Sequence, residues 1–137
     1  MKPNVLFLCT GNSCRSQMAE GFLRHYAGNR FDVQSAGTQP STVNPLAISV
    51  MREKGIDISS HRSKNAAEFL GHHFRYIITV CDNAREHCPI FPGPSIRLHW
   101  SFADPAEAAG SEAERLPVFR AVRDEIEKGI REFLSAH

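Results

Sequence analysis

The sequence lacks an excess of charge of either sign. It carries 16 Lys and Arg residues against 15 Asp and Glu residues, which gives a formal net charge of +1 at pH 7. A chain balanced in this way offers no broad positive field to nucleic acid or to an anionic membrane surface. We therefore expect neither as a partner, and any charged ligand must be recognised by local groups.

Long apolar runs and internal repeats are missing as well. The first apolar run, Val5 to Cys9, is short and contains no small-residue cleavage site, so it is neither a signal peptide nor a membrane span. The sequence therefore predicts a cytoplasmic location. With 137 residues, 42% of them hydrophobic, we expect a single globular domain over residues 1–137, acting as a monomer.

Cysteine is scarce, with four residues in the chain. In a cytoplasmic protein so few cysteines favour catalysis, metal binding or redox chemistry over a framework of structural disulfides. The position of each cysteine relative to the predicted elements therefore matters.

Short apolar runs alternate with helical patterns along the chain. We expect strands at residues 3–9, 31–35, 74–80 and 96–100. Helices or helical turns are expected at residues 18–27, 45–54, 63–70, 81–88, from 104 and from 117. This alternation predicts right-handed crossovers around a parallel sheet, with a ligand site at the carboxyl ends of the strands.

Some details of the helices are specific enough to check. Tyr26 continues an apolar row with Met18 and Phe22, Ser63 is the expected cap of its helix, and Pro117 is expected to lead the last helix. In that last helix five apolar residues repeat every four positions, as on one face of an amphipathic helix: Val118, Val122, Ile126, Ile130 and Leu134.

The first strand ends at a cysteine that faces the start of a helix. Cys9 is followed by a loop whose backbone amides can surround an anion, made of Thr10, Gly11, Asn12, Ser13, Cys14, Arg15 and Ser16. The helix dipole favours the thiolate of Cys9, and a hydroxyl donor at Ser16 would favour it further. Gly11 and Asn12 tolerate left-handed backbone angles, and Arg15 can clamp a tetrahedral oxyanion.

The alternative interpretation of this stretch is a buried cysteine, a turn and an arginine on a solvated helix face. The strand, the glycine, the helix start and the Ser16 hydroxyl all fit an anion site, so we favour that interpretation. The stretch resembles the phosphate-binding loop of low-molecular-weight protein tyrosine phosphatases and of the thioredoxin-coupled arsenate reductases that share their fold. Gln17-Met18-Ala19-Glu20-Gly21 continues the arsenate reductase version. The resemblance implies an α/β, flavodoxin-like three-layer sandwich whose four-stranded parallel sheet has the order 2-1-3-4, with helices on both faces.

Cys81 directly follows the third strand, so it should emerge at the same sheet edge as Cys9. Cys88 lies seven positions further on. Two unrelated thiols, or a zinc site with neighbouring histidines, are the alternatives, although the gap between the cysteines exceeds usual zinc spacing. The pair resembles the redox segment of the thioredoxin-coupled arsenate reductases, which tyrosine phosphatases of this fold lack. The resemblance implies a relay of three thiols and no metal site.

Two further positions carry the resemblance or raise an alternative. Asp104-Pro105 reads as a helix cap followed by a first-turn proline, and it also resembles the Asp-Pro pair whose aspartate is the family's general acid. Cys14 is expected to pack the helix start, with a protective Cys9–Cys14 disulfide as the alternative.

Some members of the family bind potassium through residues that match Asn12, Glu20 and Ser35, together with an aspartate where this chain has Lys64. The lysine argues against dependence on potassium. Its ammonium can either take the place of the ion or point to water.

These residues lead to three functional hypotheses. The first is an arsenate reductase, in which Cys9 attacks arsenate, Cys81 and then Cys88 form disulfides, and thioredoxin, or alternatively glutaredoxin, restores the thiols without another cofactor. The second is a tyrosine phosphatase, disfavoured because residues 38–57 hold no aromatic side chain to contact a phosphotyrosine ring. The third is a sensor of tetrahedral oxyanions that signals through Cys81 and Cys88.

Overall fold

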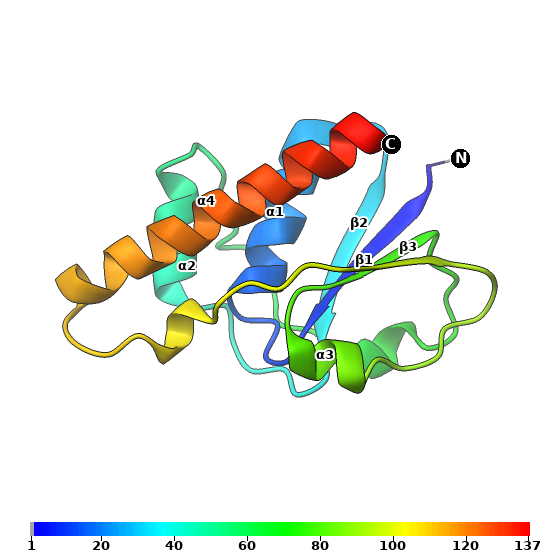
Figure 1. Ribbon diagram of the computed structural model, residues 1–137, viewed down its shortest axis with the longest axis horizontal. Coiled ribbons are helices and arrows are strands. Elements are labelled where there is room, and N and C mark those ends of the chain that lie inside the picture. The colour runs from blue at the N-terminus through cyan, green and yellow to red at the C-terminus, as the bar shows by residue number, and fades with distance from the viewer. Residues whose placement is uncertain (1) are drawn as a thin grey trace.

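The computed structural model describes residues 2–137 and is built on one parallel sheet (Figure 1). Its strands are β1 (Asn4–Cys9), β2 (Asp32–Gly37), β3 (Tyr76–Thr79) and β4 (Ile96–His99). They lie in the order β2-β1-β3-β4, and all neighbours are parallel. The predicted fold class and strand order are therefore confirmed.

The register of the sheet fixes the place of the site. Leu8 of β1 pairs with Ala36 on one side and with Thr79 on the other. Cys9 therefore leaves the sheet at the same edge as the chain that continues from β3 into Cys81.

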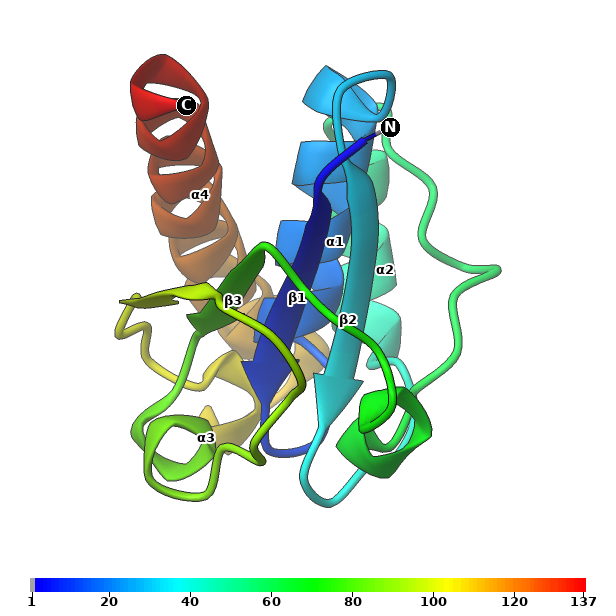
Figure 2. The ribbon, with the colours of Figure 1, turned by 90° about the vertical axis from the view of Figure 1, so that its right-hand side faces the viewer.

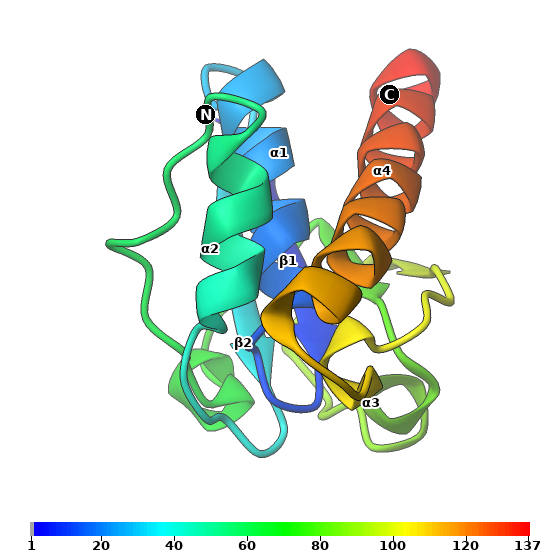
Figure 3. The ribbon, with the colours of Figure 1, turned by 90° about the vertical axis from the view of Figure 1, so that its left-hand side faces the viewer.

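The helices are distributed unequally over the two faces of the sheet. α1 (Arg15–Ala27), α2 (Pro45–Arg52) and α4 (Glu112–Ala136) lie together on one side (Figure 3). Within residues 2–137, the other side carries only the short helix α3 (Asp82–Glu86) and the 3-10 turn η1 (Ala66–Phe69) (Figure 2). A second 3-10 turn, η2 (Pro105–Glu107), precedes α4. No helix within residues 2–137 is long and apolar enough to cross a membrane.

The core forms around β1, because a central strand covered on both faces needs apolar side chains at every position. Its residues Val5 to Leu8 have no exposed surface. The main layer between sheet and helices is completed by Phe22 of α1 and by Phe119 and Ile126 of α4, which are also fully buried.

The helix expected at residues 63–70 is wrong. Only the short turn η1 forms, and it is capped by Asn65, which makes a capping box with Glu68. Ser63 instead donates its hydroxyl to the Gly11 carbonyl oxygen at 2.8 Å. The strongest local cap therefore lies two residues later than predicted, and Ser63 holds the Cys9–Ser16 loop.

The last helix also begins earlier than predicted. Ser111 and Glu114 form a capping box, α4 starts at Glu112, and Pro117 lies inside the helix. A proline so close to the N-terminus removes only one helical hydrogen bond, which the cap and the buried face outweigh. One residue of each predicted apolar row is exposed, Val118 at 38% and Tyr26 at 41%.

Candidate active site

The loop after β1 holds its shape through one left-handed residue. Asn12, rather than Gly11, has a positive φ of 48°, which an asparagine tolerates better than most residues. The neighbouring Gly37 cannot carry a side chain, since an added Cβ would collide with the Thr10 carbonyl oxygen. The loop is therefore shaped by β2 as well as by its own sequence.

Two hydrogen-bonding groups lie next to the sulfur of Cys9. The Cys9 Sγ and Ser16 Oγ atoms lie 2.9 Å apart, as the sequence predicted, and the Asn12 backbone N–H donates to the same sulfur at 3.2 Å. α1 begins at Arg15, directly behind this group. Hydrogen bonds to a sulfur and the positive end of a helix both stabilise a negative charge there.

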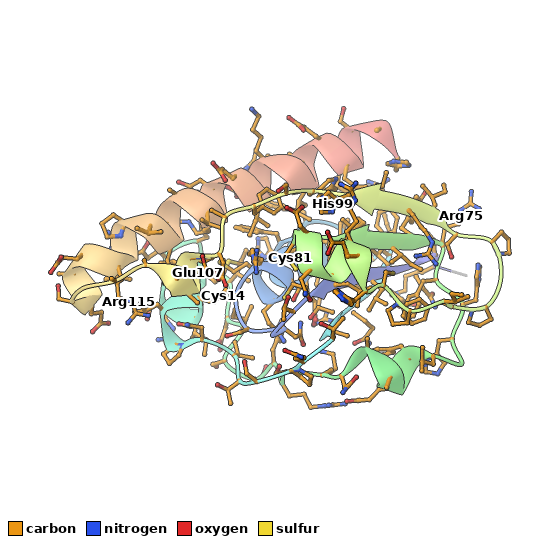
Figure 4. The ribbon with its side chains drawn as sticks, turned by 60° about the horizontal axis from the view of Figure 1, so that its bottom comes forward. Cys14, Arg75, Cys81, His99, Glu107 and Arg115 are labelled. Carbon is orange, nitrogen blue, oxygen red and sulfur yellow. The ribbon has the colours of Figure 1, made fainter. Side chains whose placement is uncertain are left out.

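Most of the predicted site residues line one cavity of about 580 Å³. Cys9, Arg15, Cys81 and Asp104 reach it from different parts of the chain, together with Cys14. Figure 4 shows Cys14, Cys81 and Glu107 gathered in one region, with Arg75 at the far end of the molecule. The residues that sequence reasoning did not single out in this lining are Ser41, Asp82, Asn83, Ala106 and Glu107.

Arg15 lies between the loop and the segment that carries the candidate acid. Its Nη1 donates to the Phe102 carbonyl oxygen at 3.1 Å, and its Nη2 lies 3.6 Å from Asp104 Oδ2. Asp104 also accepts a hydrogen bond from the Ala106 N–H at the start of η2. Both predicted readings of Asp104 are compatible, because one oxygen caps the turn while the other faces the arginine.

Cys81 is buried beside the loop. Its Sγ lies 3.4 Å from Thr10 Oγ1 and accepts a hydrogen bond from the Ala84 N–H, so that it caps α3. Thr10 Oγ1 also donates to Asn83 Oδ1 at 3.1 Å. The first turn of α3 is thereby attached to the anion loop. The one signal in the sequence for Asn83 is its position two residues after Cys81, which ends the strand segment.

The structure does not bring Cys88 to this cavity. It lines a smaller cavity of about 190 Å³ between α3 and β4, where Arg97 Nη1 lies 3.1 Å from its Sγ. Among residues 2–137, no three His, Cys, Asp or Glu side chains converge as metal ligands would. The geometry therefore gives the zinc alternative no support.

Cys14 is buried at the N-cap position of α1, and its side chain makes no capping hydrogen bond. Burial raises the pKa of the Cys14 thiol to about 12, and the negative charges of Asp104 and Cys9 act in the same direction. Cys14 therefore stays a neutral thiol at physiological pH, and a thiol is a poor nucleophile.

Lys64 lies behind the loop in a buried polar cluster. Its Nζ is 3.5 Å from Glu20 Oε1, and Arg24 pairs with the same carboxylate at 2.7 Å. Ser35 donates to Glu20 at 2.5 Å and accepts from Asn12 Nδ2 at 2.9 Å. An ammonium already stands beside the carboxylate, so these residues do not fit a bound potassium ion.

A family model described as Low molecular weight phosphotyrosine protein phosphatase matches residues 4–137. Among curated proteins, the arsenate reductase of Halalkalibacterium halodurans is 48% identical over 132 residues, which cover 96% of this chain and 95% of the relative. The arsenate reductase of Shouchella clausii is 46% identical with the same coverage.

Solved structures of arsenate reductases and of a tyrosine phosphatase also match nearly the whole chain. An arsenate reductase in a phosphate binding state matches with a TM-score of 0.79 and 33% identity, covering 99% of this chain and 98% of that one. A thioredoxin-dependent arsenate reductase of Corynebacterium glutamicum matches with a TM-score of 0.76 and 31% identity, covering 98% of this chain and 61% of that one. A low molecular weight protein tyrosine phosphatase of T. tengcongensis matches with a TM-score of 0.80 at 25% identity, covering 99% of this chain and all of that one.

Proposed function

The chain belongs to the low molecular weight phosphotyrosine protein phosphatase family, and we propose that it uses the Cys9 loop, Cys81 and Cys88 to act within that family as an arsenate reductase. It reduces arsenate to arsenite, the activity for which its relatives at 46–48% identity are named. The observation that carries the mechanism is that Cys9 and Cys81 line the same cavity.

In the first step, the Cys9 thiolate attacks the arsenic atom of arsenate and an arsenic–oxygen bond breaks. Asp104 gives a proton to the departing oxygen, which leaves as water. The guanidinium of Arg15 and the loop amides stabilise the charge on the remaining oxygens. The Arg15–Asp104 separation of 3.6 Å supports these neighbouring roles.

In the second step, the Cys81 sulfur attacks Cys9 Sγ. The sulfur–arsenic bond breaks and its electron pair stays on arsenic, so arsenite leaves and a Cys9–Cys81 disulfide remains. The contact between Cys81 and Thr10 supports this step because it keeps the second thiol beside the first.

In the third step, the thiolate of Cys88 attacks Cys81 Sγ and releases the Cys9 thiolate. The Cys81–Cys88 disulfide is then reduced by an external dithiol, for which we propose thioredoxin, with glutaredoxin as the alternative. The similarity to a thioredoxin-dependent arsenate reductase of Corynebacterium glutamicum supports this choice. We further propose that the protein works as a cytoplasmic monomer without potassium or another cofactor.

Hydrolysis of aryl phosphates is a second activity that the same loop can support, because water can attack a Cys9 phosphoenzyme. The cavity favours the reductase. Its lining contains no aromatic side chain that could contact a phosphotyrosine ring, and Glu107 adds a carboxylate. The hydrolase activity is therefore expected to be weak.

One experiment tests the proposal. Arsenate turnover coupled to thioredoxin is measured beside hydrolysis of an aryl phosphate, for the intact protein and for Cys81→Ser. We expect Cys81→Ser to lose arsenate reduction and to keep hydrolysis. Sustained reduction by Cys81→Ser would contradict the relay, and loss of both activities would point to a damaged loop.

A further inference from the structure

The segment between Cys81 and Cys88 is attached at both ends to the edge strand β4. At its first turn, Asp82 Oδ1 lies 3.0 Å from His99 Nε2. At its far end, Cys88 Sγ lies 3.1 Å from Arg97 Nη1. Arg97 and His99 are two positions apart in one strand, so they project from the same face of the sheet.

The ring of His99 is itself fixed. Its Nδ1 lies 2.7 Å from Thr79 Oγ1, on the neighbouring strand β3. In the tautomer that carries its N–H on Nε2, and in the protonated ring, His99 donates to the Asp82 carboxylate. Figure 4 shows His99 next to the start of α3, close to Cys81.

We propose that Arg97 and His99 are positioning residues that hold α3 in its dithiol form and thereby set the redox equilibrium of the Cys81–Cys88 pair. This inference rests on the proposed relay. Neither residue contacts the arsenate cavity, so each acts through the segment that it holds.

The direction of the effect follows from geometry. Cys81 caps the first turn of α3 and lines the Cys9 cavity, whereas Cys88 lies beyond the end of α3 in a separate cavity. A disulfide needs their Cα atoms about 4.4 to 6.8 Å apart with the two sulfurs facing each other, so the segment must rearrange before Cys88 can bond to Cys81. Cys88 then leaves Arg97, and the first turn carrying Asp82 can no longer keep its place beside His99.

Contacts that exist only in the dithiol form stabilise that form relative to the disulfide. Each of them makes the disulfide easier to reduce, which favours turnover by an external dithiol. Their removal should make the Cys81–Cys88 disulfide harder to reduce.

The test is a redox titration of the intact protein in buffers of reduced and oxidised dithiothreitol, without arsenate. The fraction of Cys81–Cys88 disulfide is read by alkylation of free thiols and peptide mass mapping. The variants are Arg97→Met and His99→Phe, which keep side-chain bulk but lose the N–H donors. Arg75→Met is the matched control, because Arg75 is exposed and contacts the Tyr76 ring away from α3.

We expect each variant to shift the equilibrium constant about three- to tenfold toward the disulfide, where tenfold corresponds to about 30 mV. The double variant should shift it by less than the product of the two, since both residues hold one segment. Arg97→Lys still carries an N–H donor, so its midpoint should stay close to that of the unchanged protein.

Midpoints equal to those of the unchanged protein and of Arg75→Met would overturn the inference and leave the proposed function intact. A shift toward the dithiol would overturn it equally. If the unchanged protein forms no Cys81–Cys88 disulfide at any buffer ratio, the relay of the proposed function fails, and this inference fails with it.

Discussion

Lys64 Nζ lies 3.5 Å from Glu20 Oε1, and the two side chains are only 9% and 3% exposed. From Glu20, hydrogen bonds lead through Ser35 and Asn12 to Ser16, whose hydroxyl contacts Cys9. The positive charge that balances the Glu20 carboxylate behind Cys9 therefore comes from a side chain of the protein itself.

This pairing predicts that potassium has little effect. We expect thermal midpoints and arsenate turnover to be the same in potassium chloride and in an inert salt at equal ionic strength, because no vacant position beside Glu20 needs a cation. Replacing Lys64 by Met should lower the thermal midpoint by several degrees, since it leaves a buried carboxylate with less compensation. A rise of the midpoint specific to potassium in the unchanged protein would contradict the argument.

Cys9→Ser is predicted to reduce both arsenate reduction and aryl phosphate hydrolysis to the rate without enzyme. Both reactions begin with attack by the Cys9 sulfur, and a serine hydroxyl in the same place is a far weaker nucleophile. Rates are compared at equal protein concentration, with circular dichroism as the control for folding. Reduction that survives the change would show that another thiol attacks arsenate.

Cys88→Ala is predicted to separate the two activities. The protein should release one equivalent of arsenite per chain and then stop, because the Cys9–Cys81 disulfide cannot pass to the segment that the reductant reaches. Hydrolysis of an aryl phosphate should continue unchanged, since it needs only the loop, Arg15 and an acid. A rapid-quench assay of arsenite, followed by a multiple-turnover assay with thioredoxin, distinguishes these results. Normal multiple turnover would disprove the role of Cys88.

Glu53 predicts a dependence of stability on pH. Hydrogen bonds from Arg120 and then Arg123 lower the pKa of its carboxyl to about 2. A folded-state pKa below the unfolded value contributes stability at neutral pH, and that contribution is lost as the pH falls from about 5 to 2. Because Glu53 is exposed, Glu53→Gln should lower the thermal midpoint at pH 7 by only a few degrees. The difference should vanish near pH 2, and Glu125→Gln, at an exposed site of α4, is the control.

The order of elements and the meeting of Cys9 with Cys81 could be predicted because both follow from buried strands, whose pattern is strong and whose parallel arrangement fixes one edge. Helix starts were less predictable. Ser63 and Asn65 are both good caps, and only the tertiary contact of Ser63 with Gly11 decides between them.

The direction in which a side chain points was the other feature that the sequence could not predict. Lys64 had two plausible directions, into the cluster or into water, and only the packed structure shows the first. Tyr26 belongs to an apolar row and is still partly exposed, since an amphipathic ring can pack its apolar body while its hydroxyl donates to Glu127 at 2.6 Å.

Formation of the Cys81–Cys88 disulfide is predicted to unwind α3 and extend the chain after it. In the dithiol form Cys81 lies against Thr10 while Cys88 lies in a separate cavity, so bond formation requires the segment between them to rearrange. The prolines that follow should confine the change to the segment up to about residue 94, because they do not take up helix.

Amide hydrogen exchange on the dithiol and disulfide forms checks this change. Exchange should become faster after oxidation near residues 81–94 and remain the same in β1 and α1. The unwound segment would then present its disulfide to a reductant, which explains how an external dithiol distinguishes oxidised protein from reduced protein. Unchanged protection of α3, with the Cys81–Cys88 bond established by mass, would show that the disulfide forms without unwinding and that the helix does not gate reduction.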